Sequence, residues 1–461
     1  MRISIIITLL LCSGFTATIS AQSVDSITTA NVEPEIVKAW TLKQCIEYAV
    51  ENNIDIRQRI LQNRSAEIEL NTTRNSRLPN LNANMGQNFY FGRGPGRDGT
   101  YQDQTQSSSS LSVNANVSIF SGLNVSNRIK ANELNLQATI EDFNKAKEDL
   151  ALNITSYFLQ VIYNKELLAI ADEQLELTKK QLADAESLVE NGKSPESDLY
   201  DARSALARDE AARVETANAL KLSLLDLAQL LNFPDIEKFD IEMTTTDTLP
   251  VTEYVALVTP DNIYDNYINN RPSIKAAELR LKSSEYDLKV AKSAYYPSLS
   301  LGASYSNSYY HTYNPPAGTI NESLSTQWSR NGSENIGLSL NIPIFNRMSS
   351  RNQVRNARIS MENSQLALDN VRQQLYKEIQ QAYYNAIAAK EKYEAAKKAV
   401  DASRIAFIYE LRKYTAGRST SYQFEEAKKR LSQTTAETAQ AKYNLIFRTK
   451  ILDFYKGVPL F

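Results

Sequence analysis

Four stretches of the chain alternate between apolar and polar residues, over residues 80–91, 110–120, 298–309 and 334–345. The positions between the apolar ones hold mostly Asn, Ser and Gly, with almost no charge. A period of two residues predicts β-strands with one apolar face. Each stretch has 11 or 12 residues, close to the length of about 9–11 that a tilted strand needs to cross a bilayer. We therefore expect the apolar face, which includes Val113, Val117, Leu338 and Leu340, to contact lipid.

A soluble β-sandwich is the competing interpretation of these strands. Exposed sheets of soluble proteins usually carry Lys and Glu, and four strands are too few for a sandwich of 461 residues. Four strands are also too few to close a membrane barrel, which needs about eight. An open edge in hydrocarbon would leave backbone groups unpaired, at several kcal/mol each. The chain is therefore expected to oligomerise into a ring, although this argument does not fix the number of subunits.

Two longer segments, from about residue 125 to 191 and from about 354 to 416, contain neither proline nor glycine. Their apolar residues recur at spacings of three, four and seven, which predicts helices of roughly 90–100 Å at 1.5 Å per residue. Further helical segments, 198–231 and 422–455, follow Gly192 and Gly417. Each half of the chain is therefore expected to hold a long helical hairpin with a glycine at its tip.

The two halves also match each other at several short motifs. Pro79 and Pro297 are 218 positions apart, whereas Phe120 and Phe345, like Gly192 and Gly417, are 225 apart. A repeat this long excludes a short-repeat solenoid. We expect repeat 1 over residues 40–250 and repeat 2 over residues 251–461. Each repeat would contain a helix, two strands and a long hairpin.

The N-terminus predicts export. Arg2 precedes an apolar run and a small-residue site at Ser20-Ala21-Gln22, so residues 1–21 resemble a signal peptide and residues 22–39 an N-terminal extension. The remaining chain keeps one cysteine, Cys45, which allows no intrachain disulfide.

Composition argues against several kinds of function. The formal net charge is −2, which gives no electrostatic basis for binding nucleic acid. The glycines of residues 94–99 are not followed by a helix, as a dinucleotide site requires. The single histidine, His311, is expected in a loop and excludes familiar His-based catalysis. We expect neither an enzyme nor a cofactor.

The whole pattern resembles the TolC-like outer-membrane efflux family, from about Trp40 to Leu460. The resemblance depends on the repeated proline before the first strand, the Ile119-Phe120 and Ile344-Phe345 strand exits, and the tip sequence Tyr414-Thr415-Ala416-Gly417. It implies a mainly α fold with a membrane β part. A homotrimer would share a 12-stranded outer-membrane barrel continued by a periplasmic helical barrel. The resemblance also implies an exit duct that receives substrates from a periplasmic adaptor and an inner-membrane pump of the RND or ABC type.

The resemblance extends to particular residues of the hairpin tips. Tyr414 and Asp198 match the pair that closes the periplasmic mouth, and Gln423 and Glu426 match its ring of acidic residues. One ring acid is thus replaced by Gln, and Ser419 stands where the family has an arginine. The expected adaptor-docking positions lie at the two tips: Val189, Asn191, Gly192, Ser194, Ala416, Gly417, Arg418 and Ser419.

Two other functions stay open at this stage. A structural or adhesive coiled-coil protein of the envelope would use the strands only as an anchor, and its helical bundle would be solid. A soluble periplasmic binding module would be extracted without detergent. Within the duct interpretation, efflux of small molecules and secretion of a polypeptide are both compatible with the sequence.

Overall fold

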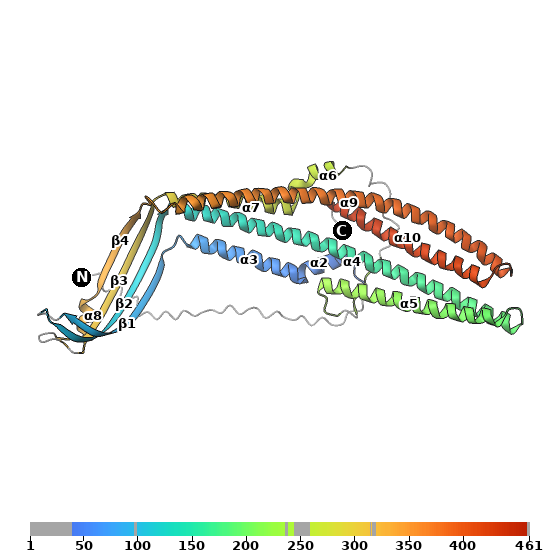
Figure 1. Cartoon of the computed structure of the whole chain (residues 1–461), viewed down its shortest axis with the longest axis horizontal. Helices are drawn as coiled ribbons and strands as arrows, with labels where there is room; N and C mark the ends of the chain where they lie inside the picture. The colour runs from blue at the N-terminus through green and yellow to red at the C-terminus, as the bar shows by residue number, and fades with distance from the viewer. Residues whose placement is uncertain are drawn as a thin grey trace. The chain divides into compact units, whose positions relative to one another are not determined.

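The computed structural model describes residues 39–95, 99–235, 238–243, 259–313, 315 and 320–458. The expected signal peptide and nearly all of the N-terminal extension lie outside these residues. The chain from Trp40 onward forms one compact unit. It is mainly helical and contains a four-stranded sheet (Figure 1).

The sheet is antiparallel throughout, with strand order β1-β2-β3-β4. The strands are β1 (Asn80–Pro95), β2 (Tyr101–Ser121), β3 (Ser298–Thr312) and β4 (Ser333–Asn341). β1 and β4 lie at the two edges, where the part of the chain that the structure describes supplies no further strand.

The strand ends differ from those expected from the pattern. β2 begins at Tyr101 rather than near residue 110, because its Ser/Gln/Thr-rich first half pairs with β1 without any apolar alternation. β3 continues to Thr312, so His311 lies in a strand and not in a loop. β4 ends at Asn341 instead of continuing to about residue 345. Pro343, which has no N–H to donate, follows two residues later.

Four helices start or end beside the sheet: α3 (Ile54–Asn75), α4 (Asn124–Glu190), α7 (Pro272–Lys292) and α9 (Ser349–Thr415). They pack as neighbours in the order α3, α4, α7 and α9 (Figure 1). α4 and α9 continue beyond the others and pair with α5 (Glu196–Leu231) and α10 (Ser421–Tyr455). These two hairpins are close to the ranges expected from the Pro- and Gly-free segments.

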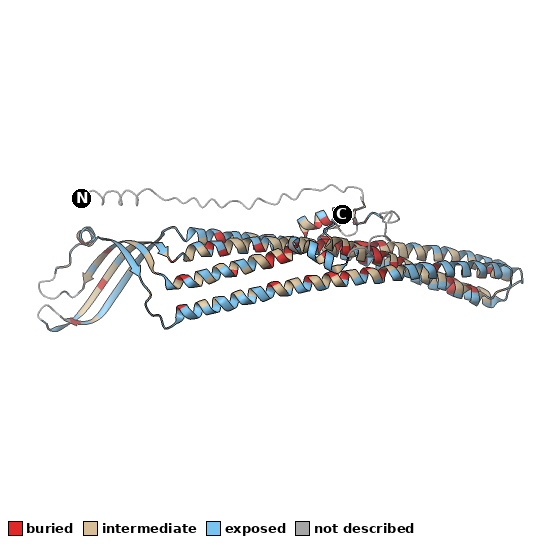
Figure 2. Cartoon of the chain, turned by 90° about the horizontal axis from the view of Figure 1, so that it is seen from above, coloured by how far each residue is buried: buried red, intermediate tan, exposed pale blue. Residues whose placement is uncertain are grey.

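The apolar core lies among the helices. One cluster joins α2 (Leu42–Asn52), α4, α5 and α10, and includes Cys45, Ile154, Phe158 and Leu227. A second cluster joins α6 (Pro260–Tyr267), α7, α9 and α10 around Ile274. The strands carry almost no buried residues, as Figure 2 shows by their pale blue and tan colour. No helix in the described ranges combines the length and apolarity that crossing a membrane requires.

The strand-to-helix transitions use a left-handed backbone. Gly122 and Leu123 have φ values of 61° and 65° before α4, and Arg347 and Met348 have values of 54° and 63° before α9. A Cβ on Gly122 would lie 2.8 Å from the carbonyl oxygen of Ser293, so only glycine fits there. Arg347 adopts the same kind of conformation with a side chain, which is uncommon for a residue other than glycine.

Candidate functional site: the sheet faces and the hairpin tips

The register divides the sheet into two faces with different chemistry. Val117 is aligned with Leu301, and Leu301 with Leu338. Past a bulge between Ser118 and Phe120, Phe120 is aligned with Leu299, and Leu299 with Leu340. Since directly opposed residues of a sheet share a face, Val113, Val117, Leu338 and Leu340 lie on one apolar face. This face is exposed in the single chain, with Leu338 64% and Leu340 60% accessible.

The opposite face consists of short polar residues and glycine. One aligned row contains Asn82, Asn114, Ser304 and Asn335. The next row contains Asn80, Asn116, Gly302 and Gly337. Small uncharged side chains leave room on this face and can hydrogen-bond to water, as the wall of a water-filled channel requires.

The apolar stretches are staggered from strand to strand. The stretch is centred on Met85 in β1 and on Ala115 in β2, whereas the register aligns Ala115 with Leu81. The fourth stretch continues past the end of β4 and is centred on Leu340, which is aligned with Leu299 near the start of β3. A stagger in one direction is what tilted strands produce when their apolar band is level with a membrane.

The edge of β3 beyond β4 is covered by side-chain amides. Gln327 of the short helix α8 (Leu324–Arg330) accepts from the backbone N–H of Tyr310 at 2.9 Å and donates to its carbonyl at 2.8 Å. Asn321 makes the same two contacts with Thr312, and Asn331 donates to the carbonyl of Ser308. Every second residue of this edge is therefore paired without a strand. The sequence pattern missed α8 because a helix of two turns has no measurable period.

Both hairpin tips are built in the same way. The N–H of Gly192 donates to the carbonyl of Val189 at 2.9 Å, and that of Lys193 to Leu188 at 2.8 Å. Gly417 and Arg418 donate to Tyr414 and Lys413 at the same two distances. These are the paired bonds of the glycine C-cap that ends a helix, and they require φ > 0 at the glycine. The observed φ values are 67° for Gly192 and 70° for Gly417.

The expected docking positions are accessible. Asn191, Gly192, Ala416, Gly417 and Arg418 are exposed, and Val189, Ser194 and Ser419 are partly exposed. A Cβ added to either tip glycine would meet no atom within 4 Å, so the surface around both glycines is open.

The residues expected at the gate lie in the first turns of α5 and α10 and at the end of α9. Asp198 accepts from the Ser194 hydroxyl at 2.5 Å. The Tyr414 ring stacks on Phe424 with 4.8 Å between centroids. Burial raises the pKa of the Tyr414 hydroxyl, and the nearby carboxylates of Asp198, Glu425 and Asp184 raise it further. Asp198 is thus near Tyr414, and a direct bond between the two stays a prediction.

Gln423 and Ser419 have partners within their own hairpin. Gln423 forms a reciprocal capping box with Thr420, and Glu426 is exposed one turn further along α10. Ser419, at the position of the family arginine, donates to Glu410. This bond and that from Lys413 lower the pKa of the Glu410 carboxyl. The described residues contain no group of three or more His, Cys, Asp or Glu placed to hold a metal ion.

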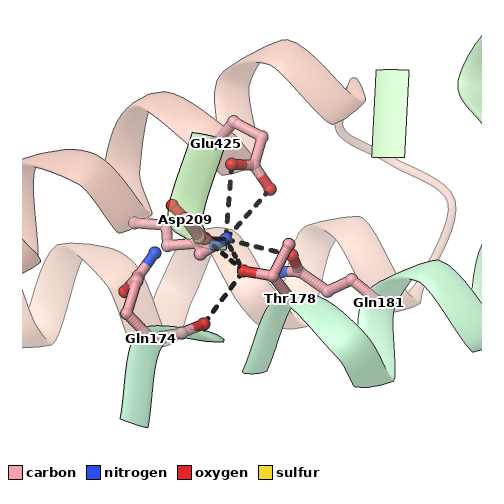
Figure 3. Close-up of polar contacts among 6 residues, drawn as sticks. Gln174, Thr178, Gln181, Asp209 and Glu425 are labelled. Atoms are coloured by element: carbon pink, nitrogen blue, oxygen red, sulfur yellow. Dashed lines mark hydrogen bonds and ion pairs between the residues drawn. The ribbon is translucent and has the colours of Figure 1, made fainter. Parts of the chain in front are cut away.

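A buried polar cluster behind the tips was not expected from the sequence (Figure 3). Lys428 of α10 is only 2% exposed. Its ammonium donates to Thr178 Oγ1 at 2.6 Å and to Gln181 Oε1 at 3.3 Å, both on α4. It forms ion pairs with Asp209 of α5 at 3.3 Å and with Glu425 at 3.4 Å. Because Asp209 is 219 residues and Thr178 250 residues from Lys428, no local sequence pattern could reveal this cluster.

Comparison with known proteins supports this organisation. The family model described as outer membrane efflux protein matches residues 45–232 and 263–452. The chain belongs to this family, whose members are channels of the TolC type, and it is therefore an outer-membrane protein with a periplasmic helical extension.

Individual relatives are distant. The chain is 26% identical to the probable outer membrane lipoprotein SilC of Salmonella typhimurium over 72% of its own length and 66% of that protein. It is 23% identical to the pyoverdine export outer membrane protein OpmQ of Pseudomonas putida, over 70% of the chain and 64% of OpmQ. The matches thus span less than two thirds of the length of these two relatives. The crystal structure of the Campylobacter jejuni CmeC outer membrane channel superimposes with a TM-score of 0.74 at 17% identity, covering 93% of this chain and 90% of CmeC.

Proposed function

We propose that this protein is the outer-membrane exit duct of a tripartite efflux or type I secretion system, and that it conducts substrates passively. The observation that carries the proposal is a sheet of four strands with two open edges, one apolar face and one Asn/Ser/Gly face. Three copies would close a barrel of twelve strands and satisfy the backbone groups of β1 and β4. The polar face would then line the pore.

The periplasmic partner would dock on the hairpin tips. Members of the family work with periplasmic adaptors and inner-membrane pumps, and are typically trimers. In this chain two exposed glycine caps of identical geometry present the same backbone surface from both hairpins. We infer that the two halves are a duplicated unit, since the order of strand pair and long hairpin occurs twice. A trimer would therefore present six similar tips to the adaptor.

Conductance tests the duct directly. The purified oligomer is inserted into planar bilayers and measured with and without its adaptor. Discrete conductance steps are expected when the adaptor is present. A solid, adhesive coiled-coil protein would insert without such steps, and a soluble module would not insert at all. Chemical crosslinking in cells, followed by purification, should recover the adaptor and would also show which type of pump it serves.

Tryptophan substitutions test the docking surface. Gly192→Trp and Gly417→Trp should keep folded oligomers and abolish export, because a large side chain covers the contact surface. Gly99→Trp is the matched control, since Gly99 also has a positive φ, of 79°, with no atom within 4 Å of an added Cβ. It lies in the β1–β2 connection, at the other end of the strands from α4. Full export by both tip variants would show that the adaptor binds elsewhere.

A further inference from the structure

The Lys428 cluster is a polar connection between the two hairpins behind their tips. Lys428 belongs to the α9–α10 hairpin, whereas Thr178, Gln181 and Asp209 belong to the α4–α5 hairpin. All the groups around the ammonium are oxygen acceptors, so the cluster holds the positive charge from several sides (Figure 3). Thr178 also donates to the carbonyl of Gln174, a back-bond of the kind that bends helices.

The contacts at the tips are of a different kind. The bonds of Asp198 with Ser194, and of Glu410 with Lys413 and Ser419, stay within one hairpin. These bonds do not join the two hairpins, so among the described tip residues only the predicted Tyr414–Asp198 lock would oppose their separation. Separation at Lys428 would instead break its bonds with Thr178, Gln181 and Asp209 and leave only Glu425, on the same helix, as its partner in the part of the chain that the structure describes.

We propose that Lys428 is the positioning residue that fixes α10 to the α4–α5 hairpin, so that the hairpins part only on the tip side of this cluster. Lys428 lies 11 residues after Gly417, and Thr178 lies 14 residues before Gly192. At 1.5 Å per residue, the movable segments are about 16 and 21 Å long. This inference rests on the proposed function, because it says which part of the helical mouth opens.

Distances between spin labels test the proposal on the purified oligomer. One pair of labels, at Glu210 and Arg430, lies next to the cluster, and a second pair, at Asn191 and Arg418, lies at the tips; all four positions are exposed. The buried thiol of Cys45 does not compete for the label. We expect a narrow distance distribution for the first pair and a broad one for the second. If the two label pairs gave equally broad distance distributions while Lys428 is intact, the proposal would be overturned.

Removing the charge should release the connection. Lys428→Met is expected to broaden the Glu210–Arg430 distribution, whereas Lys429→Met, the exposed neighbour on the same helix, should leave it unchanged. Asp209→Asn is the milder variant if Lys428→Met does not fold, and it should broaden the same distribution less. A loss of heat stability in Lys428→Met without any broadening would show a role in folding only.

Conductance separates this inference from the proposed duct. Lys428→Met should raise the resting open fraction by about tenfold, which corresponds to about 1.4 kcal/mol, and Lys429→Met should not raise it. If the unmodified protein never conducts, the duct is wrong, and the label distances still decide whether Lys428 joins the hairpins. If the unmodified protein conducts, and Lys428→Met keeps a narrow Glu210–Arg430 distribution together with a low resting conductance, the inference is wrong.

Discussion

An arginine placed in the middle of the apolar face should destabilise the membrane-inserted oligomer strongly. Ala115 is the centre of the apolar stretch of β2 and is aligned with Leu81 and Ala303 on its two sides. Arginine near the bilayer midplane of a β-barrel costs about 2–4 kcal/mol. Three copies would therefore lose on the order of 6–12 kcal/mol together. Because β2 is paired on both sides, the change does not disturb a contact between subunits.

The adjacent residue is the control. Asn114 is on the polar face, aligned with Asn82 and Ser304, so Asn114→Arg places the same charge in the pore. Leu111→Arg tests how the cost of an arginine depends on its depth in the bilayer. Leu111 lies four residues from Ala115, about 14 Å along the strand and about 10 Å in height for a tilt of 40°. This is close to the edge of an apolar band about 25 Å tall, where arginine costs about 0–1 kcal/mol.

The assay is heat dissociation of the oligomer folded in lipid vesicles, followed on gels without boiling. The expected order of stability is unmodified protein, then Asn114→Arg and Leu111→Arg, with Ala115→Arg clearly lowest. Equal losses from Ala115→Arg and Asn114→Arg would refute the assignment of the two faces. Equal losses from Ala115→Arg and Leu111→Arg would refute the position of the band.

Three further predictions follow from single residues. Tyr414→Phe and Asp198→Ala should each raise the resting conductance, and the double variant should be little worse than either; unchanged conductance in Tyr414→Phe would exclude a hydroxyl lock. Arg347→Gly should raise the thermal stability by about 1 kcal/mol, because Arg347 has a φ of 54° that glycine adopts without strain; calorimetry would measure it, and a loss would mean that the Arg347 side chain makes a stabilising contact. Burial raises the pKa of Cys45 from 9.0 to about 12. As the pH rises, the unfolded chain therefore loses the Cys45 proton before the folded chain does. The free energy of unfolding should fall between pH 9 and 12, and Cys45→Ala should remove that part of the decline.

The long hairpins could be predicted because their signals are local. An α-helix excludes proline and disfavours glycine in its interior, so the ends of α4 and α9 are marked within a few residues by where these residues return. The same holds for the tips. Gly192 and Gly417 stand at the only positions of the turn that need φ > 0, and the sequence shows them directly.

Other parts of the structure depend on partners that are distant in the chain. The first half of β2 has no apolar period, and it becomes a strand only because β1 and β3 lie beside it. The amides of Asn321 and Gln327 look like ordinary loop residues until the uncovered edge of β3 is known. Lys428 resembles any solvated lysine of a polar helix, since all of its acceptors except Glu425 come from two helices of the other half. A single sequence contains these residues but not their proximity.

The two halves also show how a matched position can acquire two different uses. Asp198 and Gln423 both stand at the third helical residue after their tip glycine, in the first turns of α5 and α10. Gln423 is engaged in the capping box with Thr420, whereas the Asp198 carboxylate accepts from the Ser194 hydroxyl and, among the described residues, keeps acceptor capacity. Ser419 is uncharged and donates to Glu410, so this position lacks the positive charge that the family arginine would bring. We therefore expect a lock at this mouth to depend on Asp198 and Tyr414. Gln423→Ala should weaken the start of α10 without raising the resting conductance, whereas Asp198→Ala should raise it.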